Sequence, residues 1–116
     1  MRRYHHLGIP TTEPRPGESH LAKHKVFIVG HEKSEYGLEW MRFEEGANVP
    51  DLIRRMPHVA FEVGDLDAEL VGKELLIAPN SPSPGVRVAF IVESGMPIEL
   101  MEFTDPHHPA RLHRFA

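Results

Sequence analysis

The feature that most constrains the fold of this chain is an internal repeat of short, strand-like segments. Residues 57–63 resemble residues 4–10, so that His58 aligns with His6 and a small residue follows each histidine two positions later. A strand that carries a histidine therefore occurs twice in the chain. Internal repeats of this kind are among the most informative features that a sequence can carry about its fold.

A second pair of segments repeats a glutamate in the same way. Residues 37–43 align with residues 97–103, and the alignment places Glu39 over Glu99. Because side chains alternate between the two faces of a strand, each glutamate shares its face with the methionine and phenylalanine that follow it at two-residue spacing. Each half of the chain thus offers one imidazole and one carboxylate in matching surroundings.

Two histidines and two glutamates that converge on one cavity would form a divalent metal site, because imidazole and carboxylate together suit Zn, Ni, Fe or Mn. A single histidine in a strand is more often a hydrogen-bonded structural residue than a ligand. Four residues of these types at matching positions in two copies are harder to explain by packing alone. The sequence therefore predicts a metal site made by the residues His6, Glu39, His58 and Glu99.

These segments resemble the vicinal oxygen chelate superfamily, which includes glyoxalase I, methylmalonyl-CoA epimerase, extradiol dioxygenases, and fosfomycin and bleomycin resistance proteins. The resemblance covers nearly the whole chain and is stronger in the second half. It is carried by His6-Leu7-Gly8-Ile9, Glu39, residues 57–63 with Asp65-Leu66-Asp67, residues 84–90 and residues 98–103. It implies an α+β fold in which two tandem βαβββ modules, the first abbreviated, curl a mostly antiparallel mixed sheet around a central cavity.

Module boundaries follow from the repeat. We expect one glyoxalase-like domain over residues 1–116, with a first module at 1–47, a helical linker at 48–56, a second module at 57–104 and a C-terminal tail at 105–116. In the linker, Asn48 is the expected helix cap. In the second module, a short helix is expected from Asp65 to Val71, with Asp65 as its cap and Gly72 at its end.

Two proline-rich segments interrupt the pattern. Two prolines and a glycine within residues 14–17 forbid the helix that the family would place in the first module, so we expect a loop there. Residues 79–85 hold three prolines and are also expected to form a loop. The first loop either reaches over the binding site or is a plain surface connection, and the second is a candidate binding loop because it is long for a hairpin connection.

The remaining histidines receive other assignments. If the first strand is regular, His5 points away from His6, toward the other side of the sheet or a partner subunit. The histidines at positions 20, 24 and 31 lack counterparts in the second half and are expected at the surface. The tail histidines at positions 107, 108 and 113 are expected in a solvated segment, and Arg87 is a candidate for binding a substrate anion.

Composition limits the possible partners. The chain has 116 residues, of which 41% are hydrophobic and 26% charged, as is ordinary for one globular domain. A net charge of −4 argues against binding to nucleic acid. No apolar run approaches the ~20 residues that span a bilayer, and no signal-peptide pattern is present, so we expect a cytoplasmic protein without membrane association. The absence of cysteine leaves only histidine and carboxylate side chains as metal ligands.

Two classes of function are compatible with these observations. In the first, one divalent metal ion (Zn, Ni, Mn or Fe) serves a lyase or isomerase acting on a small α-hydroxy or α-keto compound through an enediolate, with Glu99 the first and Glu39 the second candidate for the base. In the second, the chain is a metal-free binding protein of the bleomycin-resistance type. An extradiol dioxygenase is a further alternative, but it typically uses only two histidines and one glutamate for Fe(II), so a fourth good ligand counts against it. Uncovered sheet edges in the abbreviated module favour a homodimer.

Overall fold

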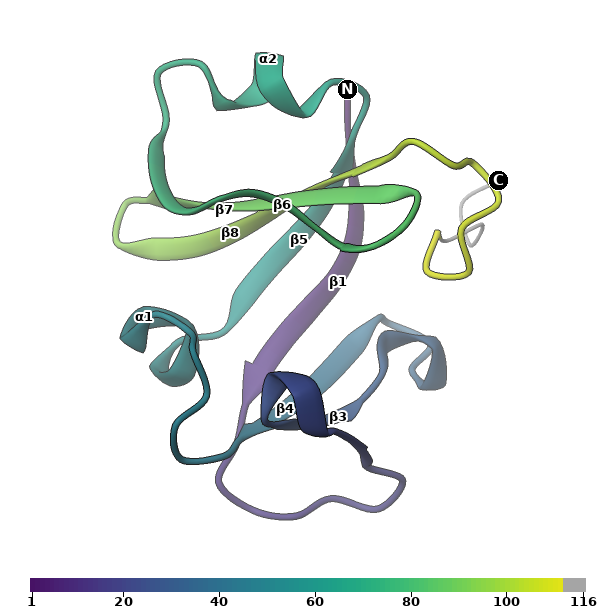
Figure 1. Cartoon of the computed structure of the whole chain (residues 1–116), viewed down its shortest axis with the longest axis vertical. Helices are drawn as coiled ribbons and strands as arrows, with labels where there is room; N and C mark the ends of the chain where they lie inside the picture. Colours follow the sequence, from purple (N-terminus) through teal and green to yellow (C-terminus); the bar gives the residue numbers. More distant parts are fainter. Residues whose placement is uncertain (112–116) are drawn as a thin grey trace.

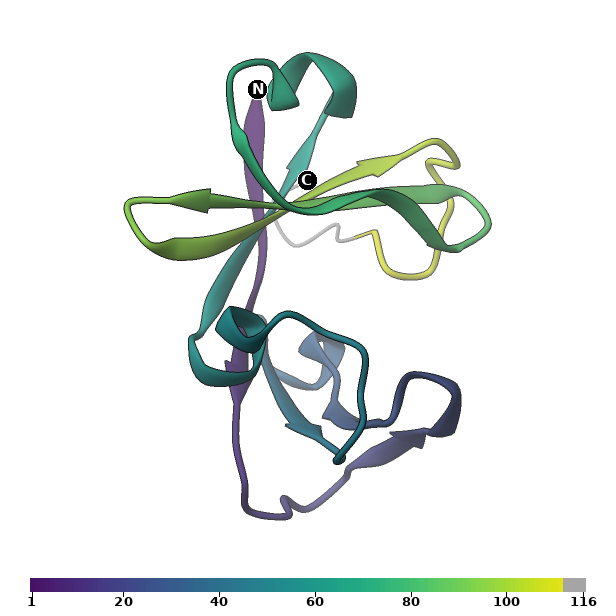
Figure 2. The ribbon, with the colours of Figure 1, turned by 60° about the vertical axis from the view of Figure 1, so that its left-hand side comes forward.

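A single curled sheet dominates the structure. The computed structural model describes residues 1–111, and within that range it contains one eight-stranded sheet with the order β2-β3-β4-β1-β5-β8-β7-β6. Two views show β1 and β5 running through the middle of the molecule, with the rest of the second half above and the rest of the first half below (Figures 1 and 2). The strands are β1 (Arg2–Pro10), β2 (Ser19–Leu21), β3 (Val26–Val29), β4 (Leu38–Phe43), β5 (His58–Val63), β6 (Glu74–Ser83), β7 (Val86–Glu93) and β8 (Met96–Phe103).

The strand order shows the repeat that the sequence predicted. At the centre, β1 pairs with β5 in antiparallel fashion. On one side β4 lies parallel to β1 and is followed by β3 and β2; on the other, β8 lies parallel to β5 and is followed by β7 and β6. Each half therefore presents the same series of strands outward from the central pair. The predicted α+β fold with a mixed, mostly antiparallel sheet is confirmed.

Helices are few and short. Besides the 3-10 turns η1 (Ala22–His24) and η2 (His31–Lys33), the described residues contain α1 (Asp51–Arg55) and α2 (Leu66–Leu70). At five residues each, α1 and α2 are far below the ~20 residues that a membrane span requires. No helix in the described part of the chain is long and apolar enough to cross a bilayer.

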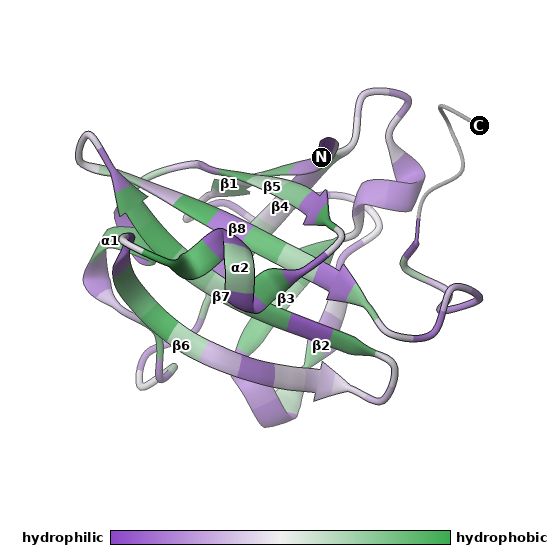
Figure 3. Ribbon diagram, turned by 90° about the horizontal axis from the view of Figure 1, so that it is seen from above, coloured by the Kyte–Doolittle hydropathy of each residue, from purple (hydrophilic) through white to green (hydrophobic). Residues whose placement is uncertain are grey.

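The α2 helix packs on one face of the second-half sheet. Its Leu66 is fully buried against Val63, Ala89 and Leu100. The opposite face carries a separate apolar cluster, in which Met101 is the immediate neighbour of Leu100 in β8. Strand alternation thus gives the sheet two apolar faces, and the hydropathy view shows the green stretches along these strands (Figure 3). Burial of a leucine side chain such as Leu66 contributes about 1.5–3 kcal/mol to folding.

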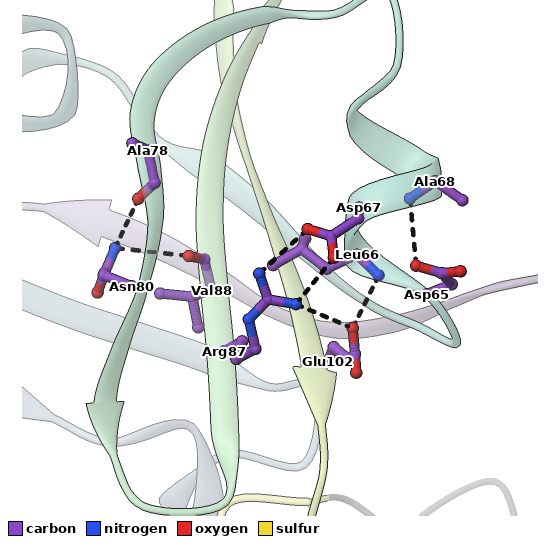
Figure 4. Close-up of polar contacts among 9 residues, drawn as sticks. All are labelled: Asp65, Leu66, Asp67, Ala68, Ala78, Asn80, Arg87, Val88 and Glu102. Carbon is purple, nitrogen blue, oxygen red and sulfur yellow. Dashed lines mark hydrogen bonds and ion pairs between the residues drawn. The ribbon is translucent and has the colours of Figure 1, made fainter.

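Helix capping agrees with the sequence in one case and differs in the other. The Asp65 side chain accepts a hydrogen bond from the Ala68 N–H at 3.2 Å, as expected for a cap (Figure 4). The linker helix is different, because its N-cap is Pro50 and it has no side-chain cap. The predicted role of Asn48 is therefore wrong: the helix begins at Asp51, which leaves Asn48 two residues too far upstream.

The first proline-rich segment contains no helix, as predicted. Residues 11–18 connect β1 to β2 as turns and irregular backbone. The end of this loop is attached to the sheet by Glu18, whose carboxylate accepts hydrogen bonds from Arg42 of β4 at 2.7 and 3.0 Å.

The second proline-rich segment is different from the prediction. Residues 79–83, which were expected to form a loop, continue β6 as far as Ser83, and only Pro84 and Gly85 form the turn. Proline is tolerated there because β6 is an edge strand whose outer N–H groups have no partner strand to lose. The pairing with β7 is irregular, and Asn80 bridges the carbonyl oxygens of Ala78 and Val88 (Figure 4).

The C-terminal segment is attached to the sheet through residue 111. Arg111 forms an ion pair with Glu62 of β5 at 3.1 Å, and the His108 ring contacts the Ser83 hydroxyl at 2.8 Å. His108 is half-buried, so its expected place in a solvated segment is wrong, whereas His107 is exposed. His113 lies outside the described residues.

Candidate metal centre

Four neighbouring strands bring the four predicted residues together. His6 lies on β1, Glu39 on β4, His58 on β5 and Glu99 on β8, and these strands are adjacent in the order β4-β1-β5-β8. The sequence repeat therefore places one histidine and one glutamate on each side of the central β1–β5 boundary.

Small residues on the central strands provide the space that these side chains occupy. Gly8 pairs with Glu39 across β1–β4 and with His58 across β1–β5. In the second half Ala60 has the equivalent position, because it pairs with His6 and with Glu99. A bulky residue at either small position would compete for the space that the imidazole and carboxylate groups occupy.

Three of the four groups form a tight cluster. The Glu99 Oε1 atom lies 3.2 Å from His6 Nε2 and 3.3 Å from His58 Nε2. The ligand atoms of these three residues all lie within 4.8 Å of one another. Ligands at ~2.1 Å from a tetrahedral ion are about 3.4 Å apart. The donor types and their separations therefore fit a divalent metal ion.

Glu39 lies slightly farther away. Its Oε2 atom is 3.9 Å from His6 Nε2, and it is not part of the three-residue cluster. Both histidines are buried, and the two carboxylate side chains are only 15% and 12% exposed for Glu39 and Glu99. The arrangement is thus three close donors with a fourth carboxylate beside them, shielded from bulk water.

The two carboxylates differ in their electrostatics. Burial alone would raise the pKa of Glu99, but the imidazoles of His58 and His6 outweigh burial and hold that pKa at about 2. For Glu39, burial dominates and raises the pKa, with the charge of Glu99 adding to the effect and His6 opposing it. Such a divergence between neighbouring carboxylates is typical of sites in which one group holds charge and the other exchanges a proton.

His5 belongs to this site, contrary to the sequence-based expectation. The β1–β5 register shifts between Tyr4 and His6, so that His5 is an extra residue in β1 and does not point to the far face or to a partner subunit. The residue is 2% exposed, with its ring Nδ1 2.7 Å from His6 Nδ1 and its Nε2 2.6 Å from the carbonyl oxygen of Ala110. Burial lowers the pKa of His5 to about 4.

His31 was expected at the surface and is instead buried. It is 7% exposed at the start of η2, and its ring centroid lies 4.6 Å from that of His5 and 5.6 Å from that of His6. The sequence carries no signal for this contact, because His31 has no counterpart in the second half. His20 and His24 are exposed as expected, and His20 contacts Glu44 at 2.6 Å.

Arg87 does not reach the candidate centre. Its guanidinium lies 3.1 Å from Asp67 of α2 and 3.7 Å from Glu102 of β8 (Figure 4). Glu102 also accepts a hydrogen bond from the Leu66 N–H at 2.9 Å. This face of the sheet is opposite to that of Glu99, so the arginine attaches α2 to the sheet and is not placed to bind a substrate anion at the centre.

Comparison with known proteins gives evidence on the fold. No family model matches the sequence, and no curated protein matches it. Among solved structures, a methylmalonyl-CoA epimerase from Mycobacterium tuberculosis is similar, with a TM-score of 0.56 and 20% identity over 86% of this chain and 87% of that chain. The fold is glyoxalase-like. A hypothetical protein from Bacillus halodurans C-125 is also similar, with a TM-score of 0.59 and 19% identity over 87% of this chain and 94% of that chain.

Proposed function

We propose that this glyoxalase-like chain is a divalent-metal-dependent isomerase or lyase that acts on a small α-hydroxy or α-keto compound through an enediolate-type intermediate. The observation that supports the proposal is the convergence of His6, His58 and Glu99 from three adjacent strands into one buried cluster. Burial of two imidazoles and a carboxylate costs free energy, so the needs of packing alone do not explain why these three groups are gathered in one buried place.

In this proposal His6, His58 and Glu99 hold the ion, which we expect to be Zn, Ni, Mn or Fe. When bound, the ion would polarise the neighbouring oxygens of the substrate and favour loss of a carbon-bound proton. Glu99 is suited to hold the ion because its carboxylate already lies between both imidazoles, at 3.2 and 3.3 Å.

Glu39 is the carboxylate best placed to move the proton. It lies beside the cluster, with its Oε2 atom 3.9 Å from His6 Nε2. Its oxygens therefore interact less strongly with the imidazoles than those of Glu99 do. The sequence alone placed Glu99 first and Glu39 second for this role, and the distances favour the reverse order. Because Glu39 is buried, little water competes for its carboxylate. Its interaction with the acidic proton of the substrate is therefore stronger than it would be in water.

The test begins with metal analysis of protein purified without chelator. We expect one divalent ion per chain, and we expect the loaded protein to exchange substrate protons in D₂O with an α-hydroxy ketone or an acyl-CoA ester. Protein that takes up no ion when offered Zn, Ni, Mn and Fe would exclude the proposal. Binding of such compounds without exchange would instead favour the metal-free binding protein.

One observation favours a second candidate function. The tight cluster contains two histidines and one carboxylate, and this set is typical of non-haem Fe(II) oxygenases. The second candidate is therefore an extradiol dioxygenase acting on a catechol. Anaerobic loading with Fe(II), followed by measurement of oxygen consumption with catechols, separates the two functions, because the isomerase or lyase consumes no oxygen.

A further inference from the structure

We propose that His5 is a positioning residue that holds a proton on His6 Nδ1 and thereby directs the His6 Nε2 atom toward the metal centre. The C-terminal segment anchors His5 through the Ala110 carbonyl group. The proposal rests on the proposed function only in that His6 is taken as a metal ligand. Neither His5 nor Ala110 has a place in the sequence repeat, so the repeat alone gives no reason to expect this arrangement.

The first step concerns the proton on the outer nitrogen of His5. This nitrogen, Nε2, lies 2.6 Å from the carbonyl oxygen of Ala110. A backbone carbonyl oxygen can only accept a hydrogen bond. The Nε2 atom of His5 therefore carries a hydrogen and donates it to Ala110.

The second step concerns the contact between the two imidazoles. The Nδ1 atoms of His5 and His6 are 2.7 Å apart, so a single hydrogen lies between them. His5 is 2% exposed and forms no ion pair with a carboxylate among residues 1–111, and a charged imidazolium would be costly in that position. With its hydrogen on Nε2, a neutral His5 has a lone pair on Nδ1. His6 Nδ1 therefore donates and His5 Nδ1 accepts.

The consequence for His6 is a defined orientation. Its Nδ1–H group points to His5, so its Nε2 atom faces Glu99 Oε1 at 3.2 Å and is the atom that can hold an ion. Histidine ligands commonly donate their second ring N–H to a neighbouring acceptor, which fixes the ring and its tautomer. Here the acceptor is a second imidazole, which is itself held by a backbone carbonyl group.

The surroundings of His5 are suited to this role. Its ring stacks against Phe103 with centroids 5.7 Å apart, and it meets the His31 ring edge-on at 4.6 Å. The segment that carries Ala110 is held by the Arg111–Glu62 ion pair and by the contact of His108 with Ser83. The ring of His5 is thus confined by packing and hydrogen-bonded at both nitrogens.

Three variants test the proposal. In His5→Phe the ring shape remains, but the acceptor for His6 is lost. In His5→Asn the side-chain oxygen can take the place of Nδ1 as acceptor. His20→Phe is the matched control, because His20 is exposed, stacks on Phe27 and is not part of the three-residue cluster.

The first measurement is the tautomeric state of the histidines in metal-free protein, by ¹⁵N NMR of the ring nitrogens at neutral pH. In the metal-free wild type we expect His5 to be protonated at Nε2 only, and His6 to be protonated both at Nδ1 and at Nε2, which lies 3.2 Å from Glu99 Oε1. In His5→Phe we expect His6 Nδ1 to lose its proton while Nε2, which faces Glu99, retains one. A wild-type His5 protonated at Nδ1, with His6 Nδ1 bare, would overturn the proposal.

The second measurement is zinc affinity in a competition titration with a chelating indicator. Loss of an outer partner of a ligand typically lowers metal affinity by about 10- to 100-fold. We expect a loss of this order for His5→Phe, recovery to within a few-fold of wild type for His5→Asn, and no change for His20→Phe. Equal losses in both His5 variants would show a merely structural role. Failure of the wild type to bind any of Zn, Ni, Mn and Fe would exclude the proposed function, whereas the NMR result would still decide the role of His5.

Discussion

Gly8 lies directly opposite His58 across the β1–β5 pair, and a Cβ atom added to Gly8 would overlap the His58 imidazole ring. The relationship is reciprocal, because His6 lies opposite Ala60, which is completely buried. Each histidine therefore occupies space that the partner strand leaves by carrying a small residue. This explains why the chain pairs each histidine with a small residue two positions later.

Gly8→Ala is expected to displace the His58 ring and weaken metal binding. The added methyl group meets three ring atoms of His58, and overpacking of this kind typically costs 1–3 kcal/mol of stability. We expect zinc affinity to fall by about 10-fold or more, with a modest decrease in the free energy of unfolding. Gly64→Ala is the control, because an added Cβ there has no neighbour within 4 Å. Unchanged zinc affinity in Gly8→Ala would show that the spacing is not needed for the metal centre.

The two glutamates are expected to respond differently to substitution by glutamine. Glu39→Gln should retain the ion, because the three-residue cluster is intact, but lose proton transfer, which typically contributes about 10² to 10⁴ in rate. Glu99→Gln should lower the metal content, because it removes the charged donor between His6 and His58. Proton exchange and bound metal are measured together on each variant.

A surface glutamate provides the control for this comparison. Glu44→Gln alters a carboxylate that contacts exposed His20 and should leave both exchange and metal content unchanged. If Glu39→Gln turned over a verified substrate at the wild-type rate, Glu39 would not be the base. Loss of turnover in Glu99→Gln at full metal occupancy would return that role to Glu99.

The positions of the main site residues could be predicted because they follow from the repeat. Strand periodicity placed His58 on one face with Ala60, and Glu99 on one face with Met101, and the pairing of β5 with β8 brings these faces together. The same local pattern operates in the first half. The duplicated strand pattern thus accounts for the matching strand order of the two halves and for the approach of His6, His58 and Glu99 to one another.

The outer residues of the site could not be predicted from such patterns. His5 reaches the centre because β1 carries one extra residue, and a strand irregularity of this kind has no signature in the sequence. Its partner Ala110 is 105 residues away along the chain, and only the folded C-terminal segment brings it near. His31 is buried by packing of η2 beside β4, which is likewise a long-range effect.

Self-association, predicted from the uncovered sheet edges, remains to be measured. The edge strand β2 is exposed along its whole length, and Leu21 on β2 and Leu75 on β6 are 41% and 50% exposed. Exposed edges with apolar side chains favour pairing with a second copy. We expect sedimentation at micromolar concentration to show a species of twice the 13.2 kDa chain mass, and Leu21→Lys or Leu75→Lys to shift it toward the monomer. A monomer alone in the wild type would contradict the prediction.

The stability conferred by Glu18 is expected to depend on pH. Its hydrogen bonds with Arg42 lower the pKa of Glu18 below the ordinary value of 4.5, and the Arg42 guanidinium also lies over the Phe27 ring at 4.1 Å. Because the folded pKa is lowered, the contribution is complete above the unfolded pKa and is lost as the pH falls through the folded pKa. Urea unfolding should therefore show Glu18→Gln to be less stable than wild type at pH 7, with the difference shrinking below pH ~4. Glu13→Gln, at an exposed position in the same loop, is the control and should show no such difference. If the stability difference between Glu18→Gln and wild type stayed undiminished at low pH, the charged interaction would not be its cause.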